Sequence, residues 1–245
     1  MKVSLFTTCL VDSLFPNVAE AMVKILDRYG VEVDFPHGQT CCGQPAFNSG
    51  YVDEAREVAK TLLDAFDQSE YVVAPSGSCT GMIHHYYADL FAGLPDWEDK
   101  AERLINKTYE FSQFMVNVLG VTDLGARFPH RVAYHPSCHG ARLLGIKNEP
   151  EQLLDHIQDI QRVNFPHAHD CCGFGGTFAI KMSDISGAMV EEKTKHVVES
   201  EAEVLVSTDM GCLMNIDGRL RYENQKVQVK HLAEVLYEGL PAEKE

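Results

Sequence analysis

The residues with the clearest chemistry in this chain are eight cysteines, which fall into two sets of four. In each set a single cysteine is followed, after 31 or 32 residues, by two adjacent cysteines and a glycine; a fourth cysteine comes 36 or 39 residues later. Four thiolates can hold one tetrahedral zinc ion or one four-cysteine iron–sulfur cluster. The two sets are Cys9, Cys41, Cys42 and Cys79, and Cys138, Cys171, Cys172 and Cys212.

A repeated nonapeptide surrounds the two cysteine pairs. The segment 165–173 reads FPHAHDCCG and the segment 35–43 reads FPHGQTCCG, so six of nine positions are identical at a constant offset of 130. Such a repeat indicates an internal duplication. We therefore predict two similar modules, residues 1–130 with a helical extension and residues 131–245.

The elements that carry the cysteines alternate between short apolar segments and amphipathic ones. Alternation of this kind predicts an α/β fold with two Rossmann-like parallel-sheet units. Because ligands bind at the carboxyl ends of parallel strands, cysteines just after the strands are expected to gather there. Residues 91–130 are expected to be a helical extension and a connection, with a helix over 101–119. The predicted strands are 3–6, 31–35, 71–74, 131–134, 161–165, 204–207 and 227–229, and the main helices are 16–29, 52–66, 150–159, 185–199 and 231–237.

Spacing separates the two kinds of metal site. Zinc ribbons and fingers take two ligands from one Cys-x₂₋₄-Cys turn, and neither set contains Cys-x₂-Cys. The side chains of adjacent cysteines are expected to diverge and so to reach different irons of one cluster. Spacing thus favours iron–sulfur clusters over zinc, and thiol redox chemistry by the adjacent cysteines is a third option.

Composition and charge limit the partners and the cellular compartment that we expect for this protein. The net charge of −15 is spread over both halves, and the sequence has no Lys/Arg cluster of the kind that nucleic acid binding requires. It contains no apolar run long enough to span a membrane and no signal-peptide pattern at its start. We expect a cytoplasmic protein, with peripheral membrane association left open. Structural disulfides are not expected in that compartment.

Five stretches around the cysteines resemble the duplicated cysteine-rich CCG domain. That family includes the cysteine-rich subunit of heterodisulfide reductase and the iron–sulfur subunits of glycolate oxidase and anaerobic glycerol-3-phosphate dehydrogenase. The resemblance covers nearly the whole chain, and within the family it points to the stand-alone CCG proteins of lactate utilization. The stretches are CCGQPAFN from Cys41, SGSC from Ser76, HPSCH from His135, CCGFGGTF from Cys171 and CLMN from Cys212.

The resemblance implies a cofactor, partners and a function. It implies an iron–sulfur cluster, of the 4Fe-4S type, held by each set of four cysteines. It also implies an electron-transfer subunit of a complex that oxidises L-lactate to pyruvate together with other iron–sulfur subunits. The alternatives are a thiol/disulfide redox subunit, an iron–sulfur subunit for glycolate or glycerol-3-phosphate oxidation, and a structural zinc-binding module. Whether this chain is itself a catalytic oxidoreductase stays open, and no catalytic residue is assigned.

Two positions depart from the heterodisulfide reductase pattern. That enzyme carries Cys-x-x-Cys after the third strand, which gives five cysteines per module and a non-cubane cluster. Here the fifth position holds Met82 in the first module and Asn215 in the second. A four-thiolate cluster in each half is therefore the simpler expectation.

Other motifs point less clearly to chemistry. The run from Gly173 to Gly176 lacks the third glycine of a dinucleotide fingerprint, because Phe178 stands in its place. The histidines His37, His135 and His167 lie near the cysteines in sequence. Each is expected either to be fixed by neighbouring backbone or to ligate, hydrogen-bond or tune a cluster.

Overall fold

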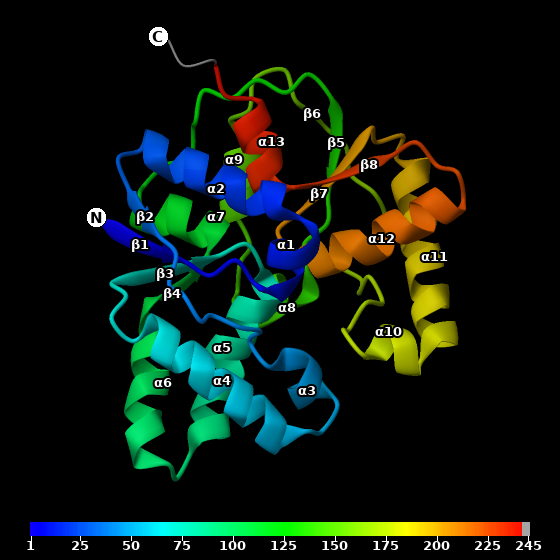
Figure 1. Ribbon diagram of the computed structural model, residues 1–245. Helices are drawn as coiled ribbons and strands as arrows, with labels where there is room; N and C mark the ends of the chain where they lie inside the picture. The colour runs from blue at the N-terminus through cyan, green and yellow to red at the C-terminus, as the bar shows by residue number, and fades with distance from the viewer. Residues whose placement is uncertain (242–245) are drawn as a thin grey trace.

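The computed structural model describes residues 1–241 and contains two four-stranded parallel sheets with the same strand order (Figure 1). In each sheet the first strand lies between the second and the third, and the fourth strand pairs with the third. This arrangement confirms two Rossmann-like units related by duplication. In order across each sheet the strands are β2 (Glu32–Asp34), β1 (Lys2–Leu5), β3 (Tyr71–Ala74) and β4 (Thr108–Glu110), then β6 (Gln161–Arg162), β5 (Arg131–Tyr134), β7 (Val204–Ser207) and β8 (Gln228–His231).

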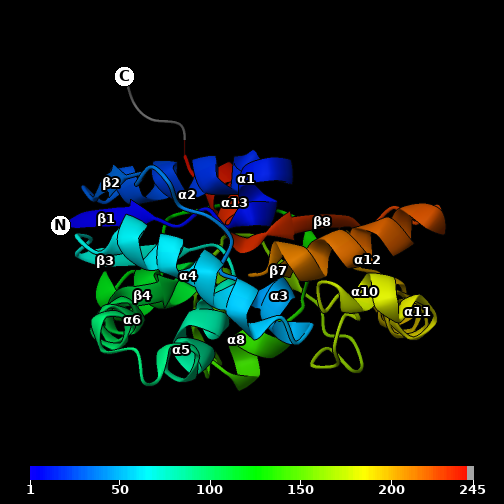
Figure 2. The same cartoon turned by 60° about the horizontal axis from the view of Figure 1, so that its bottom comes forward.

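Helices cover both faces of the strands. Figure 2 shows α2 and α13 above the strands and α5, α6 and α8 below them. Within residues 1–241, no helix combines the length and the apolar character that crossing a bilayer requires. The first-half helices are α1 (Cys9–Leu14), α2 (Pro16–Arg28), α3 (Gln44–Asn48), α4 (Val52–Phe66), α5 (Gly77–Phe91), α6 (Pro95–Lys107), α7 (Phe111–Gln113) and the π-helical turn η1 (Phe114–Val118). The second-half helices are α8 (Cys138–Arg142), α9 (Glu149–Asp155), α10 (Phe178–Lys181), α11 (Ser183–Glu199), α12 (Met210–Tyr222) and α13 (Leu232–Glu238).

The hydrophobic core joins the two halves. One cluster of fully buried side chains includes Met22 and Ile25 of α2 together with Leu232 and Val235 of α13, and α2 and α13 lie side by side in both views (Figures 1 and 2). Burial of this apolar surface from both halves stabilises their association. The predicted module boundary between residues 130 and 131 stays a prediction.

The region 91–130 differs from its prediction. The predicted helix over 101–119 is wrong, because α6 ends at Lys107 and the next three residues form β4, which pairs with β3. Thr108 and Tyr109 are good strand formers, and their backbone groups complete the edge of the first sheet. The tertiary pairing therefore overrides the helical pattern of the sequence around it.

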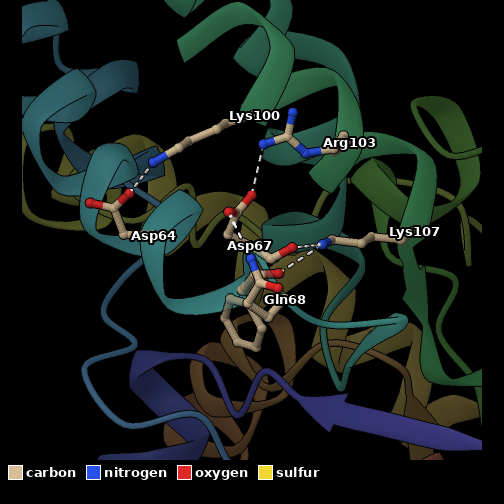
Figure 3. A network of polar contacts seen from close by, with 7 residues as sticks. Asp64, Asp67, Gln68, Lys100, Arg103 and Lys107 are labelled. Carbon is tan, nitrogen blue, oxygen red and sulfur yellow. Dashed lines mark hydrogen bonds and ion pairs between the residues drawn. The ribbon is translucent and has the colours of Figure 1, made fainter. Parts of the chain in front are cut away.

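A polar network fixes α6 against the end of α4 (Figure 3). Lys100 pairs with Asp64 at 2.6 Å, and Arg103 pairs with Asp67 at 2.8 Å. Lys107 Nζ donates to the last carbonyls of α4, the nearer at 2.7 Å. Cations at a helix C-terminus are favourable, so this network docks the last turns of α6 on the end of α4.

Candidate metal centres

The first set of cysteines comes together at the carboxyl edge of the first sheet. Cys9 is the first residue of α1, Cys41 and Cys42 precede α3, and Cys79 lies in the first turn of α5. Cys9 Sγ is 3.7 Å from Cys41 Sγ. The thiols of Cys41 and Cys42 interact with each other, as do those of Cys42 and Cys79. The divergence expected of the adjacent cysteine side chains stays a prediction.

Polar side chains hold the first CCG loop in place. Gln39 accepts a hydrogen bond from the Thr7 backbone at 3.1 Å and donates to the carbonyl of Leu5 at 3.1 Å. The buried Tyr87 hydroxyl donates to the Cys42 carbonyl at 3.0 Å. These bonds tie the loop to the end of β1 and to α5.

The second set of cysteines has the same arrangement. Cys138 begins α8, Cys171 and Cys172 precede α10, and Cys212 lies in the first turn of α12. The thiols interact in the order Cys138, Cys171, Cys172 and Cys212. The structure thus brings each predicted set of four thiols together, one set per half.

Glycine is required after both cysteine pairs. Gly43 and Gly173 have φ angles of +84° and +83°. A Cβ atom on Gly43 would lie 3.0 Å from the Ala55 carbonyl oxygen, and one on Gly173 would lie 2.8 Å from that of Ser186. The backbone of each loop must therefore pack directly against the following long helix, α4 or α11.

The two sites open into one cavity of about 170 Å³ that all eight cysteines line. Ser78, His139 and Asp209 supply polar groups to its wall, and Phe174 and Met210 supply apolar ones. The exposure of the thiols is graded, since Cys9 is exposed whereas Cys42, Cys172 and Cys212 are buried. The two sites therefore share one cavity, in which Cys9 is open to solvent and the three buried thiols are enclosed by protein.

Asp209 links the two halves at the floor of this cavity. It caps α12 with Oδ1, which accepts from the backbone of Gly211 at 3.0 Å and of Cys212 at 3.4 Å. Its Oδ2 accepts from the Ser78 backbone at 2.8 Å and from the Ser76 hydroxyl at 3.1 Å. Ser76 in turn caps α5 by accepting from the Cys79 backbone at 3.2 Å. The helices that present Cys79 and Cys212 thus share one hydrogen-bond network.

Each site has one thiol whose charged form is stabilised. Hydrogen bonds from Cys42 and Cys9 lower the pKa of Cys41 to about 3, and those from Cys138 and Cys172 lower the pKa of Cys171 to about 2. Because the donating thiols Cys9 and Cys138 lose those bonds on ionising, their pKa values are raised. Each site therefore favours the thiolate form of one cysteine, and the thiolate is the form that binds metals.

The three predicted histidines take different places. His37 and His167 are exposed, and neither lines the cavity. His135 is fully buried, and a ring nitrogen of His135 and the sulfurs of Cys172 and Cys212 lie within 4.8 Å of one another. Burial, with the Lys193 charge, lowers the pKa of His135 to about 4.

The two positions of the missing fifth cysteine carry no thiol chemistry. Met82 is fully buried in the core of the first half. Asn215 donates from Nδ2 to the Cys172 carbonyl at 2.8 Å. Both side chains therefore support the loops that hold the cysteines.

Several residues of the site were missed by sequence reasoning. Asp209 and Ser76 each stand three positions before a cysteine, and Asp and Ser are favoured helix N-caps, so that pattern identifies them. Gln39 and Lys193 act through long-range contacts for which the sequence has no local pattern. His139 lies in the HPSCH motif, but only the structure gives it a contact, with its Nδ1 3.4 Å from Cys138 Sγ.

Comparison with known proteins agrees with this geometry. The profile of the CCG family, described as a cysteine-rich domain, matches residues 3–84 and 132–217, once in each half. Lactate utilization protein A 2 of Bacillus cereus (strain AH820) is 54% identical over 240 residues, which cover 98% of this chain and 99% of the relative. Lactate utilization protein A of Oceanobacillus iheyensis is 57% identical over 236 residues, 96% of each chain.

A solved structure shares the fold. A hypothetical protein from Helicobacter pylori superposes with a TM-score of 0.68 at 12% sequence identity, covering all of this chain and 49% of that one. This chain thus spans about half the length of that structure, and the likeness concerns the fold alone. By its two cysteine-rich domains and its full-length relatives, the chain belongs to the CCG-domain family of lactate utilization A proteins.

Proposed function

We propose that this chain is a cytoplasmic iron–sulfur electron-transfer subunit of a complex that oxidises L-lactate to pyruvate. The observation that carries the proposal is the pair of four-thiol sites facing one cavity. Its relatives at 54–57% identity are named for lactate utilization. Oxidation of lactate to pyruvate releases two electrons and two protons, so a subunit serving that reaction needs a redox centre.

The donor sets fit iron–sulfur clusters. Each site offers four thiols, of which one is held as a thiolate and others are buried among apolar side chains. A cluster bound there would accept and release single electrons. The cysteines would bind it, and Asp209 would keep Cys79 and Cys212 in position through the two helix caps.

Electron transfer and hydride removal are assigned to different subunits on the basis of the sequence. The run from Gly173 to Gly176 is not a dinucleotide fingerprint. Gly175 instead lets the backbone pass close to Phe178, and the Gly173 backbone donates to Cys171 Sγ at 3.4 Å. We therefore assign removal of hydride from lactate to a cofactor on a partner subunit.

The test is analysis of protein purified without oxygen, together with two variants. We expect about four to eight irons per chain with matching acid-labile sulfide, as two four-thiolate sites would hold, and an EPR signal that changes on reduction. Cys79→Ser and Cys212→Ser should each reduce the iron content at one site. Lactate-dependent reduction with the partner subunits, set against glycolate and glycerol-3-phosphate, then tests the substrate.

One distance favours a second candidate, a structural zinc module. Two sulfurs on one tetrahedral zinc lie about 3.8 Å apart for Zn–S bonds of about 2.3 Å, and Cys9 Sγ and Cys41 Sγ are 3.7 Å apart. Stoichiometric zinc with neither sulfide nor visible colour after attempted reconstitution would establish this candidate and reject the electron carrier. Turnover of a small disulfide with an artificial reductant would instead indicate thiol/disulfide chemistry.

A further inference from the structure

The two metal sites have the same frame but different neighbours. Leu5 pairs with Val73 in the first sheet, and Tyr134 pairs with Val206 in the second. The following residues are therefore equivalent: the Phe6 backbone donates to the Val73 carbonyl at 2.9 Å, and the His135 backbone donates to that of Val206 at 2.8 Å. A buried imidazole in the second half thus replaces a buried phenyl ring in the first.

A second replacement lies on the helix behind each CCG loop. Gly43 packs on Ala55 of α4 and Gly173 packs on Ser186 of α11, so Ala55 and Ser186 are equivalent positions. The residues seven positions further along each helix are then equivalent as well. These positions hold Leu62 and Lys193, both buried. Lys193 Nζ donates to the His167 carbonyl at 2.5 Å and to the Ala168 carbonyl at 3.0 Å.

These contacts fix the orientation of the His135 ring. His135 Nδ1 is 3.1 Å from the Ala168 carbonyl oxygen, which also accepts from Lys193. A carbonyl oxygen accepts only, so Nδ1 must carry the proton. Nε2 is buried and, within residues 1–241, has no hydrogen-bond partner. In a neutral ring its lone pair is therefore free.

His135 thus has a free, buried Nε2 and a ring nitrogen close to two thiols, an arrangement typical of a metal ligand. Metal-bound histidines usually donate their other ring N–H to a carbonyl or carboxylate, which sets the tautomer and the ring orientation. Here that acceptor is the Ala168 carbonyl, and a ring nitrogen of His135 lies within 4.8 Å of the Cys172 and Cys212 sulfurs. An unpartnered buried nitrogen is costly in a folded protein, and a metal ion would satisfy it.

We propose that His135 Nε2 is a metal ligand of the second site, so that the two halves hold unequal centres. The first site offers thiolates alone, because Phe6 stands where an imidazole would be needed. The second offers thiolates and one imidazole, a donor set for iron or zinc. The inference rests on the proposed function only in that the second site binds metal.

The inequality has a consequence for electron transfer. If the His135 imidazole took the place of one thiolate on an iron–sulfur centre, it would raise the reduction potential of that centre. The buried ammonium of Lys193 acts in the same direction, because a nearby positive charge favours the reduced, more negative centre. Of two centres in this cavity, the second should therefore be reduced first.

Cobalt(II) tests the ligand set without any iron–sulfur cluster. Metal-free, thiol-reduced protein is titrated with Co²⁺ alone, and nitrogen couplings are read by pulsed EPR in unlabelled and ¹⁵N-histidine-labelled protein. We expect one bound Co²⁺ to show a coupling that changes with the label, and the other to show none. This readout needs no folded variant and is independent of lactate oxidation.

Two variants assign the nitrogen. His135→Phe, which installs the first-half residue, should abolish the coupling and weaken Co²⁺ binding at that site by roughly tenfold or more, since even outer-shell changes cost 10–100-fold. His167→Gln, an exposed histidine of the same loop, should change neither. Occupied sites without a histidine coupling, failure of Co²⁺ to bind at the second site, or a coupling that survives His135→Phe would each overturn the proposal.

Discussion

The bridge at Asp209 predicts that one carboxylate supports both metal sites. Asp209→Asn keeps the shape and the Oδ1 acceptor that caps α12, but it turns an N–H₂ group toward the backbone N–H of Ser78. The Ser76 hydroxyl can rotate to accept, whereas the backbone N–H of Ser78 cannot. The substitution therefore removes one charge-assisted hydrogen bond and leaves two donors facing each other.

The expected costs follow from the bonds that each variant loses. A hydrogen bond to a charged group contributes about 1.5–3 kcal/mol, so Asp209→Asn should lower the free energy of unfolding by about 2 kcal/mol. Asp209→Ala also loses the Ser76 bond and the cap of α12, and a lost N-cap costs about 1 kcal/mol. Its total should be roughly 4 kcal/mol.

The assay is urea unfolding of the metal-free, thiol-reduced protein, followed by circular dichroism, so that metal loss does not contribute. Ser76→Ala provides the partner for a double-mutant cycle with Asp209→Ala, in which contacting residues couple by about 0.5–3 kcal/mol. In metal-loaded protein, Asp209→Ala should weaken both sites. The bridging role of Asp209 is refuted if Asp209→Asn changes the free energy of unfolding by less than about 0.5 kcal/mol, or if the effects of the two alanine variants are additive.

Three further changes have defined outcomes. Gly173→Ala places a Cβ atom 2.8 Å from the Ser186 carbonyl oxygen at a φ of +83°. It should lower the free energy of unfolding by about 2 kcal/mol and reduce metal binding at the second site alone. Metal analysis, with Cys212→Ser as the reference variant, measures this loss. Tyr87→Phe leaves the buried Cys42 carbonyl unpaired and should cost about 1–2 kcal/mol in urea unfolding, so an unchanged midpoint would contradict this role. Burial raises the pKa of Glu110 from 4.5 to about 8, so the folded protein keeps a proton that the unfolded chain releases. Stability from this group is lost as pH rises from about 5 to 8, by at most ~1.4 kcal/mol per pH unit, and Glu110→Gln should flatten that slope in unfolding curves measured across the range.

The grouping of the cysteines could be predicted because it depends on topology. A strand followed by a helix and a parallel strand returns the chain to the same edge of a sheet, so residues such as Cys9 and Cys41, far apart in sequence, become neighbours. The repeat then extends the result from one half to the other. Neither step needs side-chain detail.

Features that depend on tertiary contacts, within one half or between the two, could not be predicted. The sequence pattern predicts a helix where β4 (Thr108–Glu110) lies, because the strand forms only by pairing with β3. The opening of both sites into one cavity requires the two sheets to be placed relative to each other, and the shared core of α2 and α13 does this. The sequence pattern of one half does not predict how that half packs on the other.

The differences between the halves are hidden for a related reason. The offset between equivalent residues is 129 at Cys9 and Cys138 but 133 at Cys79 and Cys212, so no single shift of the sequence aligns Phe6 with His135 and Leu62 with Lys193. His37 and His167, which the simple offset does align, are exposed and lie outside the cavity wall. The histidine with a free nitrogen beside the thiols is instead the one whose counterpart is phenylalanine. Equivalent residues of the two halves must therefore be identified from the sheet register and the glycine contacts. The sequence offset shows only that the halves are repeated, whereas the structural pairing shows that their metal sites differ.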